Sequence, residues 1–257
     1  MSSPATSLES RHEVERRFHD ERMAGRQADD RDFYAFGGMD LVLEAYRQAV
    51  GDLRGKTVLD FGCGDGARSI DYAKRGATVY AFDISSESVR TLVEAAEQAG
   101  IADRIHPSVM PAESLVYDSE TFDLVLGVAI LHHTDVALVE REIDRVLKPG
   151  GRAVFIEPLA HNPFLRLFRR LTPNRRTPTE QPMTVGQIRR FVGRFRQGRF
   201  RGFHLLSIVP PGILWATGNR TIFRRMMRVT QTIDRGLLAL MPPLRRYCWM
   251  ALIDVTK

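Results

Sequence analysis

Between residues 56 and 157, short apolar runs alternate with amphipathic stretches, and this alternation constrains the fold more than any other feature of the chain. The apolar runs predict buried strands, and the amphipathic stretches predict helices of about 10–15 residues. The predicted strands are 56–61, 77–82, 104–109, 122–128 and 152–157, and the predicted helices are 66–75, 85–99 and 135–147. This order is typical of a parallel sheet with helices on both faces. We therefore expect an α/β fold with a doubly wound sheet.

The flanking segments extend this core. Residues 1–55 predict an N-terminal helical cap, with helices at 10–28 and 39–53. Residues 158–257 predict the C-terminal part of the same domain. Its predicted elements are an irregular segment at 158–182, a helix at 184–195, strands at 203–209 and 247–255, and a helical insertion at about 213–241 before the last strand. With the core at 56–157, we expect a seven-stranded, mostly parallel sheet.

Charge is divided unevenly along the chain. Residues 1–150 carry 17 basic and 27 acidic side chains, whereas residues 151–257 carry 20 basic and 4 acidic ones, and 19 of those 20 are arginine. A half-chain with a net charge of +16 suits an anionic partner: a phosphorylated small molecule, an anionic lipid or a nucleic acid. A solvated basic surface is the simpler alternative.

Composition also suggests where the protein acts. The two cysteines, Cys63 and Cys248, form neither a disulfide framework nor a metal-ligand spacing. Residues 1–17 lack the apolar region of a secretory signal. We therefore expect a cytoplasmic protein without a metal site of its own.

The buried strand at 56–61 leads into a loop with glycine at positions 62, 64 and 66. Glycine is needed where the backbone passes close to a ligand or adopts a positive φ. Asp83 ends the next predicted strand, where a carboxylate can accept hydrogen bonds from both hydroxyls of a ribose. Because the third glycine comes one residue earlier than in the dinucleotide pattern G-x-G-x-x-G, the loop favours a nucleoside cofactor without pyrophosphate.

Four segments resemble, in order and spacing, the motifs of class I (Rossmann-like) S-adenosylmethionine-dependent methyltransferases of the small-molecule type. They are VLDFGCGDG at 58–66, AFDIS at 81–85, ETFDLVLGVAILHH at 120–133 and REIDRVLKPGG at 141–151. The resemblance covers residues 56–157. It implies S-adenosylmethionine as the cofactor and methyl transfer as the reaction.

The resemblance also implies how the cofactor is held. Asp60 and the backbone of two loop glycines would hold its methionine end, Asp83 its ribose, and the remaining residues its adenine or the floor beneath the methionine. The implied set is Asp60, Gly62, Gly64, Asp83, Ile84, Ala112, Glu113 and Val128. Where the family often has an acid two residues before Glu113, this chain has Pro111, so recognition of the adenine amine falls to Glu113 or to backbone.

Methyl transfer requires an aligned acceptor and exclusion of water, and an oxygen or carbon acceptor also calls for a base. His132, His133 and Glu157 lie at the carboxyl ends of predicted strands, where open α/β sheets place their ligands. Glu180 is a rare acid within a basic segment. We expect the base among Glu157, His133 and Glu180. Packing of the histidines and an ion pair of Glu180 with an arginine are the alternatives.

The acceptor must be chosen by the parts outside the core. Candidate contacts are the aromatic Tyr34 and Phe36 and the basic Arg175, Arg176, Arg224 and Arg225. The apolar, arginine-studded insertion suits an amphipathic anionic acceptor, such as a prenyl diphosphate or a lipid-like biosynthetic intermediate, methylated on carbon or oxygen. Mg²⁺ would enter only with a phosphorylated substrate.

Two other functions stay open. The basic half-chain also suits RNA or another nucleic acid. However, residues 129–132 (AILH) do not resemble the Asn-Pro-Pro-Tyr sequence of base-modifying enzymes, and no RNA-binding module is evident, which disfavours nucleic acid. The insertion at 213–241 could instead lie on a membrane surface, giving a peripheral membrane or partner-binding protein. No pattern indicates the oligomeric state.

Overall fold

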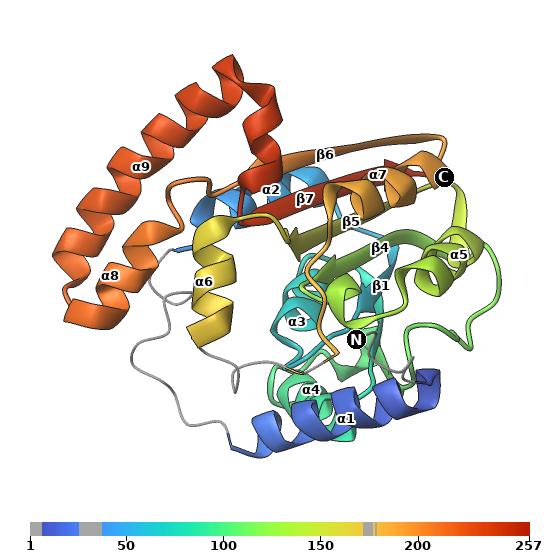
Figure 1. Cartoon of the computed structure of the whole chain (residues 1–257). Coiled ribbons are helices and arrows are strands. Elements are labelled where there is room, and N and C mark those ends of the chain that lie inside the picture. Colours follow the sequence, from blue (N-terminus) through green and yellow to red (C-terminus); the bar gives the residue numbers. More distant parts are fainter. Residues whose placement is uncertain (1–6, 26–37, 172–176, 178) are drawn as a thin grey trace.

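The computed structural model describes residues 7–25, 38–171, 177 and 179–257. Its centre is a seven-stranded sheet in the order β3-β2-β1-β4-β5-β7-β6 (Figure 1). The strands are β1 (Thr57–Phe61), β2 (Thr78–Asp83), β3 (Ile105–Val109), β4 (Phe122–Val128), β5 (Leu147–Pro158), β6 (Gln197–Phe203) and β7 (Met250–Thr256). Strands β1 to β5 pair in parallel, whereas β7 runs antiparallel to both β5 and β6. The expected α/β fold is confirmed.

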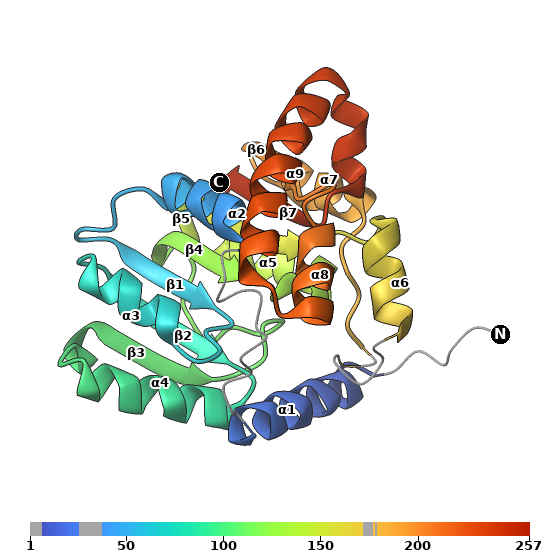
Figure 2. The same ribbon diagram turned by 90° about the vertical axis from the view of Figure 1, so that its left-hand side faces the viewer.

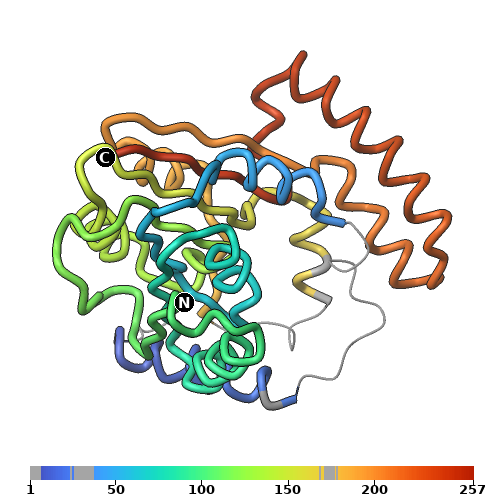
Figure 3. Tube along the Cα trace, turned by 180° about the vertical axis from the view of Figure 1, so that it is seen from behind, coloured from blue at the N-terminus to red at the C-terminus, as the bar shows by residue number. Residues whose placement is uncertain are grey.

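Helices cover both faces of the sheet. The helices are α1 (Leu8–Ala24), α2 (Asp40–Val50), α3 (Ala67–Lys74), α4 (Ser86–Gln98), α5 (Val136–Val146), α6 (Pro163–Leu171), α7 (Val185–Arg194), α8 (Val209–Thr217) and α9 (Arg220–Leu240), with short 3-10 helices η1 (Ala102–Arg104), η2 (Leu131–His133) and η4 (Pro242–Tyr247). Side chains of α2, α3 and α4 pack on one face of the sheet, and those of α5 and α7 pack on the other. Figure 3 views the backbone from the side of α2, α3 and α4. Because successive strand residues point to opposite faces, Val58 joins the first cluster and Leu59 the second.

Local signals fix where several helices begin. Ser85 caps α4, because its side chain accepts a hydrogen bond from the amide of Ser88. Thr184 and Gln187 form a capping box at the start of α7. These caps satisfy backbone N–H groups that have no partner inside the helix.

The predicted strand at 203–209 is wrong. The sixth strand is Gln197–Phe203, and the apolar residues after it form a turn that leads into α8. The amides of Leu205, Leu206 and Ser207 donate to the buried carboxylate of Asp234 rather than to a neighbouring strand. The observed strand lies at the edge of the sheet and carries arginines, a pattern that protects an exposed edge from pairing with other chains.

The expected irregular segment at 158–182 contains helix α6. Asn162 caps this helix by accepting from the amide of Leu165, and Pro163 occupies its first position. An Asn-Pro pair before an apolar, arginine-rich run is therefore a helix start that the sequence reading missed.

The insertion before β7 consists of two helices, α8 and α9, which form a hairpin projecting from the sheet (Figure 2). Leu214, Phe223 and Met227 join the two helices in a small apolar cluster of their own. Asp234 anchors α9 to the turn after β6. Within the described ranges, no helix combines the length and hydropathy needed to cross a membrane.

Candidate active site

The loop after β1 forms an open cradle at the carboxyl edge of the sheet. Its glycines 62, 64 and 66 all have positive φ values, of 74°, 52° and 77°. A Cβ at Gly62 would come within 2.7 Å of Ile130, and one at Gly66 within 2.5 Å of Leu92. A Cβ at Gly64 would meet nothing within 4 Å. The backbone at Gly64 is therefore free to approach a ligand.

Asp83 lies beside this cradle at the end of β2. Its Oδ2 accepts from the amide of Gly64 at 2.9 Å, and its Oδ1 accepts from the amide of Ser85 at 3.0 Å. Burial raises the pKa of Asp83, although these backbone hydrogen bonds oppose the rise. Each carboxylate oxygen keeps a further lone pair for a hydroxyl donor, so the geometry fits a ribose.

Asp60 lies in the buried part of β1, one residue before the end of the strand. It is 2% exposed, and Ser69 of α3 donates to its Oδ2 at 2.5 Å. Burial raises the pKa of Asp60 to about 6, and the nearby carboxylate of Asp83 adds to the rise. Arg68 opposes the rise electrostatically without cancelling it, so a positively charged ligand group would also be attracted to this buried carboxylate.

Glu157, at the end of β5, holds the turn that follows β4. It is fully buried, and its Oε1 accepts from the amides of Ile130 and Leu131 at 2.9 and 2.8 Å. Its Oε2 accepts from the amide of His132 at 3.3 Å and lies 2.7 Å from Nδ1 of the same residue. The turn starts at Ala129, whose φ of 59° is unusual for a residue with a side chain. Glu157 thus stabilises a strained turn at the edge of the cradle.

His133 follows in the same turn and faces helix α1. Its Nδ1 lies 3.0 Å from Oε2 of Glu15, and its carbonyl accepts from Nε of Arg11 at 3.0 Å. Burial lowers the pKa of His133, and the neighbouring His132 adds to this lowering, whereas the contact with Glu15 opposes it. Burial alone would raise the pKa of Glu15, but contacts with His133 and His19 outweigh it and hold that pKa well below its usual range.

Helix α1 connects the loops around the cradle. Ser85, after β2, donates to Asp20, and Nε2 of His12 lies 2.9 Å from Glu113, after β3. Together with the contacts of His133, these tie α1 to the loops after β2, β3 and β4. The sequence predicts a helical cap, but no site role was predicted for these residues of α1.

Glu113 and the other implied cofactor residues surround the same edge. Oε1 of Glu113 accepts from the amide of Asp135 at 2.9 Å, so both of its oxygens have partners. Ala112 is buried, whereas Ile84 and Val128 are half-buried. Their positions agree with a nucleoside lying across the ends of β2, β3 and β4.

Glu180 also approaches this region. Nε2 of His132 lies 3.9 Å from its Oε1, and Nη1 of Arg169 on α6 lies 2.7 Å from the same oxygen. The ion pair considered as an alternative for Glu180 is therefore present. The amide of Gln181 donates to the carbonyl of His132 at 2.8 Å, which joins this loop to the turn after β4.

Of the four basic residues proposed for the acceptor, only Arg224 and Arg225 lie within the described residues. Arg224 and Arg225 are exposed on α9, in the projecting hairpin (Figure 2). Tyr34, Phe36, Arg175 and Arg176 lie outside the described residues. Their roles stay predictions.

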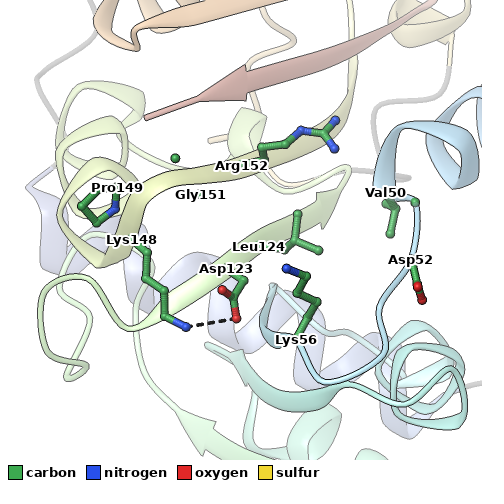
Figure 4. A pocket seen from close by; sticks show the side chains of 11 residues that line it. Val50, Asp52, Lys56, Asp123, Leu124, Lys148, Pro149, Gly151 and Arg152 are labelled. Carbon is green, nitrogen blue, oxygen red and sulfur yellow. Dashed lines mark ion pairs between the residues drawn. The ribbon is translucent and has the colours of Figure 1, made fainter.

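One hollow given by the described residues is not at this edge. It has a volume of about 420 Å³ and opens at the amino ends of β1, β4 and β5, between Lys56, Asp123 and Lys148 (Figure 4). Nζ of Lys148 lies 3.1 Å from Asp123 there. Since parallel α/β sheets bind ligands at their carboxyl ends, this hollow lies on the wrong side for the cofactor.

Sheet order, glycine cradle and acidic partner together define an α/β protein that binds a nucleoside cofactor. Residues 59–155 match the family model described as "Methyltransferase domain". The core of the chain is thus a methyltransferase domain, and it carries the motifs of class I S-adenosylmethionine-dependent methyltransferases, in agreement with the resemblance.

Relatives and solved structures agree with this family. The ubiquinone biosynthesis O-methyltransferase of Psychrobacter cryohalolentis is 35% identical over 118 residues, which are 45% of this chain and 46% of the relative. The chain therefore spans about half the length of the curated relatives it matches. The structure of Haemonchus contortus phosphoethanolamine N-methyltransferase 2 in complex with S-adenosyl-L-methionine aligns with a TM-score of 0.64 at 15% identity, covering 93% of this chain and 60% of that one. Geranyl diphosphate methyltransferase in complex with GPP and sinefungin aligns with a TM-score of 0.55 at 17% identity, covering 81% and 76%.

Proposed function

We propose that this protein transfers the methyl group of S-adenosylmethionine to an amphipathic, anionic small molecule. The observation that carries the cofactor part is the open cradle at Gly64, flanked by the buried carboxylates of Asp60 and Asp83. The cofactor supplies an electrophilic methyl group on a sulfonium. The chain contributes binding, alignment and exclusion of water.

Charge supports an anionic acceptor. Each of the four acids in residues 151–257 is used inside the fold: Glu157 by the turn after β4, Glu180 by Arg169, Asp234 by the turn after β6, and Asp254 by Arg152 and Arg199. The arginine excess of this half is thus left for solvent or for partners. Two proteins of the same fold carry names that refer to a phosphate-containing acceptor, phosphoethanolamine and geranyl diphosphate.

His132 is the best-oriented base for an acceptor hydroxyl or carbon. Its Nδ1 is held by the buried Glu157, which leaves Nε2 directed away from that carboxylate. Both oxygens of Glu157 already accept two hydrogen bonds each, and Glu180 is paired with Arg169. Glu157 therefore acts as a positioning residue in this proposal, and the base lies one residue before the His133 expected from the sequence.

A screen for methyl transfer tests the function. The purified chain is incubated with S-adenosylmethionine and with prenyl diphosphates, isoprenoid phenols, simple phenols, amines or tRNA, and the products are examined by mass spectrometry. One added methyl group on a phosphorylated or phenolic isoprenoid is expected. Methylation of tRNA alone would overturn the small-molecule proposal, and transfer only to uncharged phenols would overturn its anionic part.

We also propose that α9 contacts an anionic lipid surface, from which such an acceptor would be taken. Four apolar side chains of α9 lie on one exposed stripe, Ile222, Val229, Ile233 and Leu240, with exposed fractions of 44–83%. Arg225 borders this stripe, whereas Arg224, Arg228 and Arg235 lie farther around the exposed side of the helix, and none of the four forms an ion pair within the described parts of the chain. Exposed apolar residues beside arginines are the pattern of an interfacial helix on an anionic membrane.

A further inference from the structure

Three metal-ligating side chains converge between helix α1 and the turn after β4. Glu15 and His19 are four residues apart on α1 and so lie on the same side of the helix. His133 approaches from η2. One donor atom from each of the three lies within 4.8 Å of the other two. Glu15 and His133 are separated by 118 residues, so spacing along the chain cannot reveal this cluster.

The distances suit a tightly coordinated ion. Oε2 of Glu15 lies 3.0 Å from Nδ1 of His133 and 3.6 Å from Nε2 of His19. Two ligands of a tetrahedral zinc ion, each about 2.0–2.1 Å from the metal, are about 3.3 Å apart. The two measured distances bracket that value. The contact at 3.6 Å is too long for a hydrogen bond, so His19 faces the carboxylate without being bonded to it.

Burial and the surrounding contacts favour a bound cation. The side chains of Glu15 and His133 are only 5% and 13% exposed. The other oxygen of Glu15 accepts from the hydroxyls of Thr177 and Thr179, which fixes the orientation of the carboxylate as outer partners of metal ligands commonly do. No lysine or arginine forms an ion pair with Glu15 in the described ranges, so its buried negative charge has no fixed cation there.

A second cluster shares His133 but is already satisfied. His132, His133 and Glu180 also bring their donor atoms together. However, Nδ1 of His132 is engaged by Glu157, and Glu180 is paired with Arg169. The cluster that contains Glu15 is therefore the better candidate.

We propose that Glu15, His19 and His133 bind one divalent transition-metal ion of the Zn²⁺ or Mn²⁺ class. Two imidazoles and one carboxylate suit these ions better than Mg²⁺ or Ca²⁺, which prefer all-oxygen sites. The ion fastens α1 to the turn beside the proposed base. Three protein ligands leave a coordination position open, which a hydroxyl or phosphate oxygen of the acceptor can take. This last role rests on the proposed function, whereas binding of the ion does not.

Cobalt is a direct probe of the site. The intact chain, freed of metal with a chelator, is titrated with Co²⁺ while its visible absorption is recorded, and Zn²⁺ is then added as a competitor. We expect one Co²⁺ per chain and displacement by one equivalent of Zn²⁺. His19→Ala and His133→Ala should each weaken Co²⁺ binding at least tenfold. His161→Ala, at an exposed histidine outside the cluster, should leave the Co²⁺ affinity within twofold of that of the parent protein.

The controls separate the possible failures. His19 is 29% exposed, so its replacement should spare the fold, which a melting temperature and the affinity for S-adenosylmethionine will verify. If the folded parent protein binds no stoichiometric metal, or if His19→Ala and His133→Ala bind it as tightly as the parent, the site is refuted. S-adenosylmethionine binding without metal binding would refute the metal site and leave the proposed function standing. Metal binding without S-adenosylmethionine binding would support the metal site and refute the proposed function.

Discussion

Nδ1 of His132 lies 2.7 Å from the fully buried carboxylate of Glu157, and the same carboxylate accepts from three backbone amides of the turn that carries the histidine. A single side chain therefore fixes both the backbone and the ring of the proposed base. In acyl-transfer enzymes, a carboxylate orients the imidazole of the general base in the same way.

His132→Asn should lower kcat by about 10²- to 10⁴-fold, the usual effect of losing a general base. The Kd for S-adenosylmethionine should change by less than about threefold, because His132 is not placed in the cradle. Steady-state kinetics and calorimetry measure the two quantities. An unchanged kcat would exclude His132 as the base.

Glu157→Gln should destabilise the fold by about 1–3 kcal/mol, because the new amide group faces backbone donors that it cannot satisfy. Urea unfolding measures the loss. Glu94→Gln, an exposed surface change on α4, should shift the unfolding free energy by less than about 0.5 kcal/mol. Equal stability of the two variants would mean that Glu157 does not organise the turn.

Gly64→Ala should weaken cofactor binding at a modest cost in stability. Gly64 and Gly51 both have a positive φ, of 52° and 73°, and a Cβ at either position meets nothing within 4 Å. Both alanine variants should therefore lose about 1 kcal/mol from backbone strain. Only Gly64→Ala places a methyl group in the cradle, so it alone should weaken S-adenosylmethionine binding, at least tenfold by calorimetry. Equal affinities in the two variants would place the cofactor elsewhere.

Asp60 should make cofactor binding depend on pH. Its folded pKa of about 6 lies above the ordinary 3.8, so any stability gained from the protonated form is complete below about pH 4 and lost as the pH rises through 6. A cationic cofactor prefers the ionised form. The Kd for S-adenosylmethionine should therefore rise about tenfold between pH 7 and pH 5. Asp60→Asn should remove this dependence, and a flat profile in the parent protein would contradict it.

The exposed stripe on α9 should determine lipid binding. The chain should sediment with phosphatidylglycerol vesicles but not with phosphatidylcholine vesicles, and added salt should weaken the association. Changing Ile222, Val229 and Ile233 to Ser should weaken it at least tenfold, since several apolar side chains no longer enter the interface. Leu8→Ser/Val116→Ser, which removes exposed apolar residues elsewhere, is the matched control. Equal loss of vesicle binding in both variants would disprove a specific lipid-binding surface on α9. Dimer formation through α9 in solution would show that the stripe contacts a second copy of the chain rather than lipid.

The core was predictable because its signals are local. The conformation of a glycine loop, and the position of an acid at the end of a strand, depend mainly on the neighbouring residues. Gly62, Gly64 and Asp83 therefore lie where the sequence predicts them. The strand at 203–209 failed for the opposite reason. Its apolar run is typical of a buried strand, but its backbone amides donate to Asp234, about 30 residues later, instead of to a neighbouring strand. Only the tertiary structure reveals this contact.

The rest of the candidate site depends on contacts between distant residues. Glu15 meets His133, and His12 meets Glu113, across more than 100 residues. The four-residue spacing of Glu15 and His19 on a charged helix was the one local signal for this region. Their shared helical face could have suggested a ligand pair, but nothing in the sequence identified the third member.

Helix α1 is fastened to the loops after β2, β3 and β4 by polar contacts rather than by an apolar seam. We expect a nucleoside held between those loops to leave more slowly while these contacts persist. The rates of cofactor binding and of release of the spent cofactor would then depend on how often α1 moves away from the loops. This motion, rather than methyl transfer, would limit the rate of turnover. Substitutions on α1 that never touch the acceptor would accordingly alter the rate of turnover.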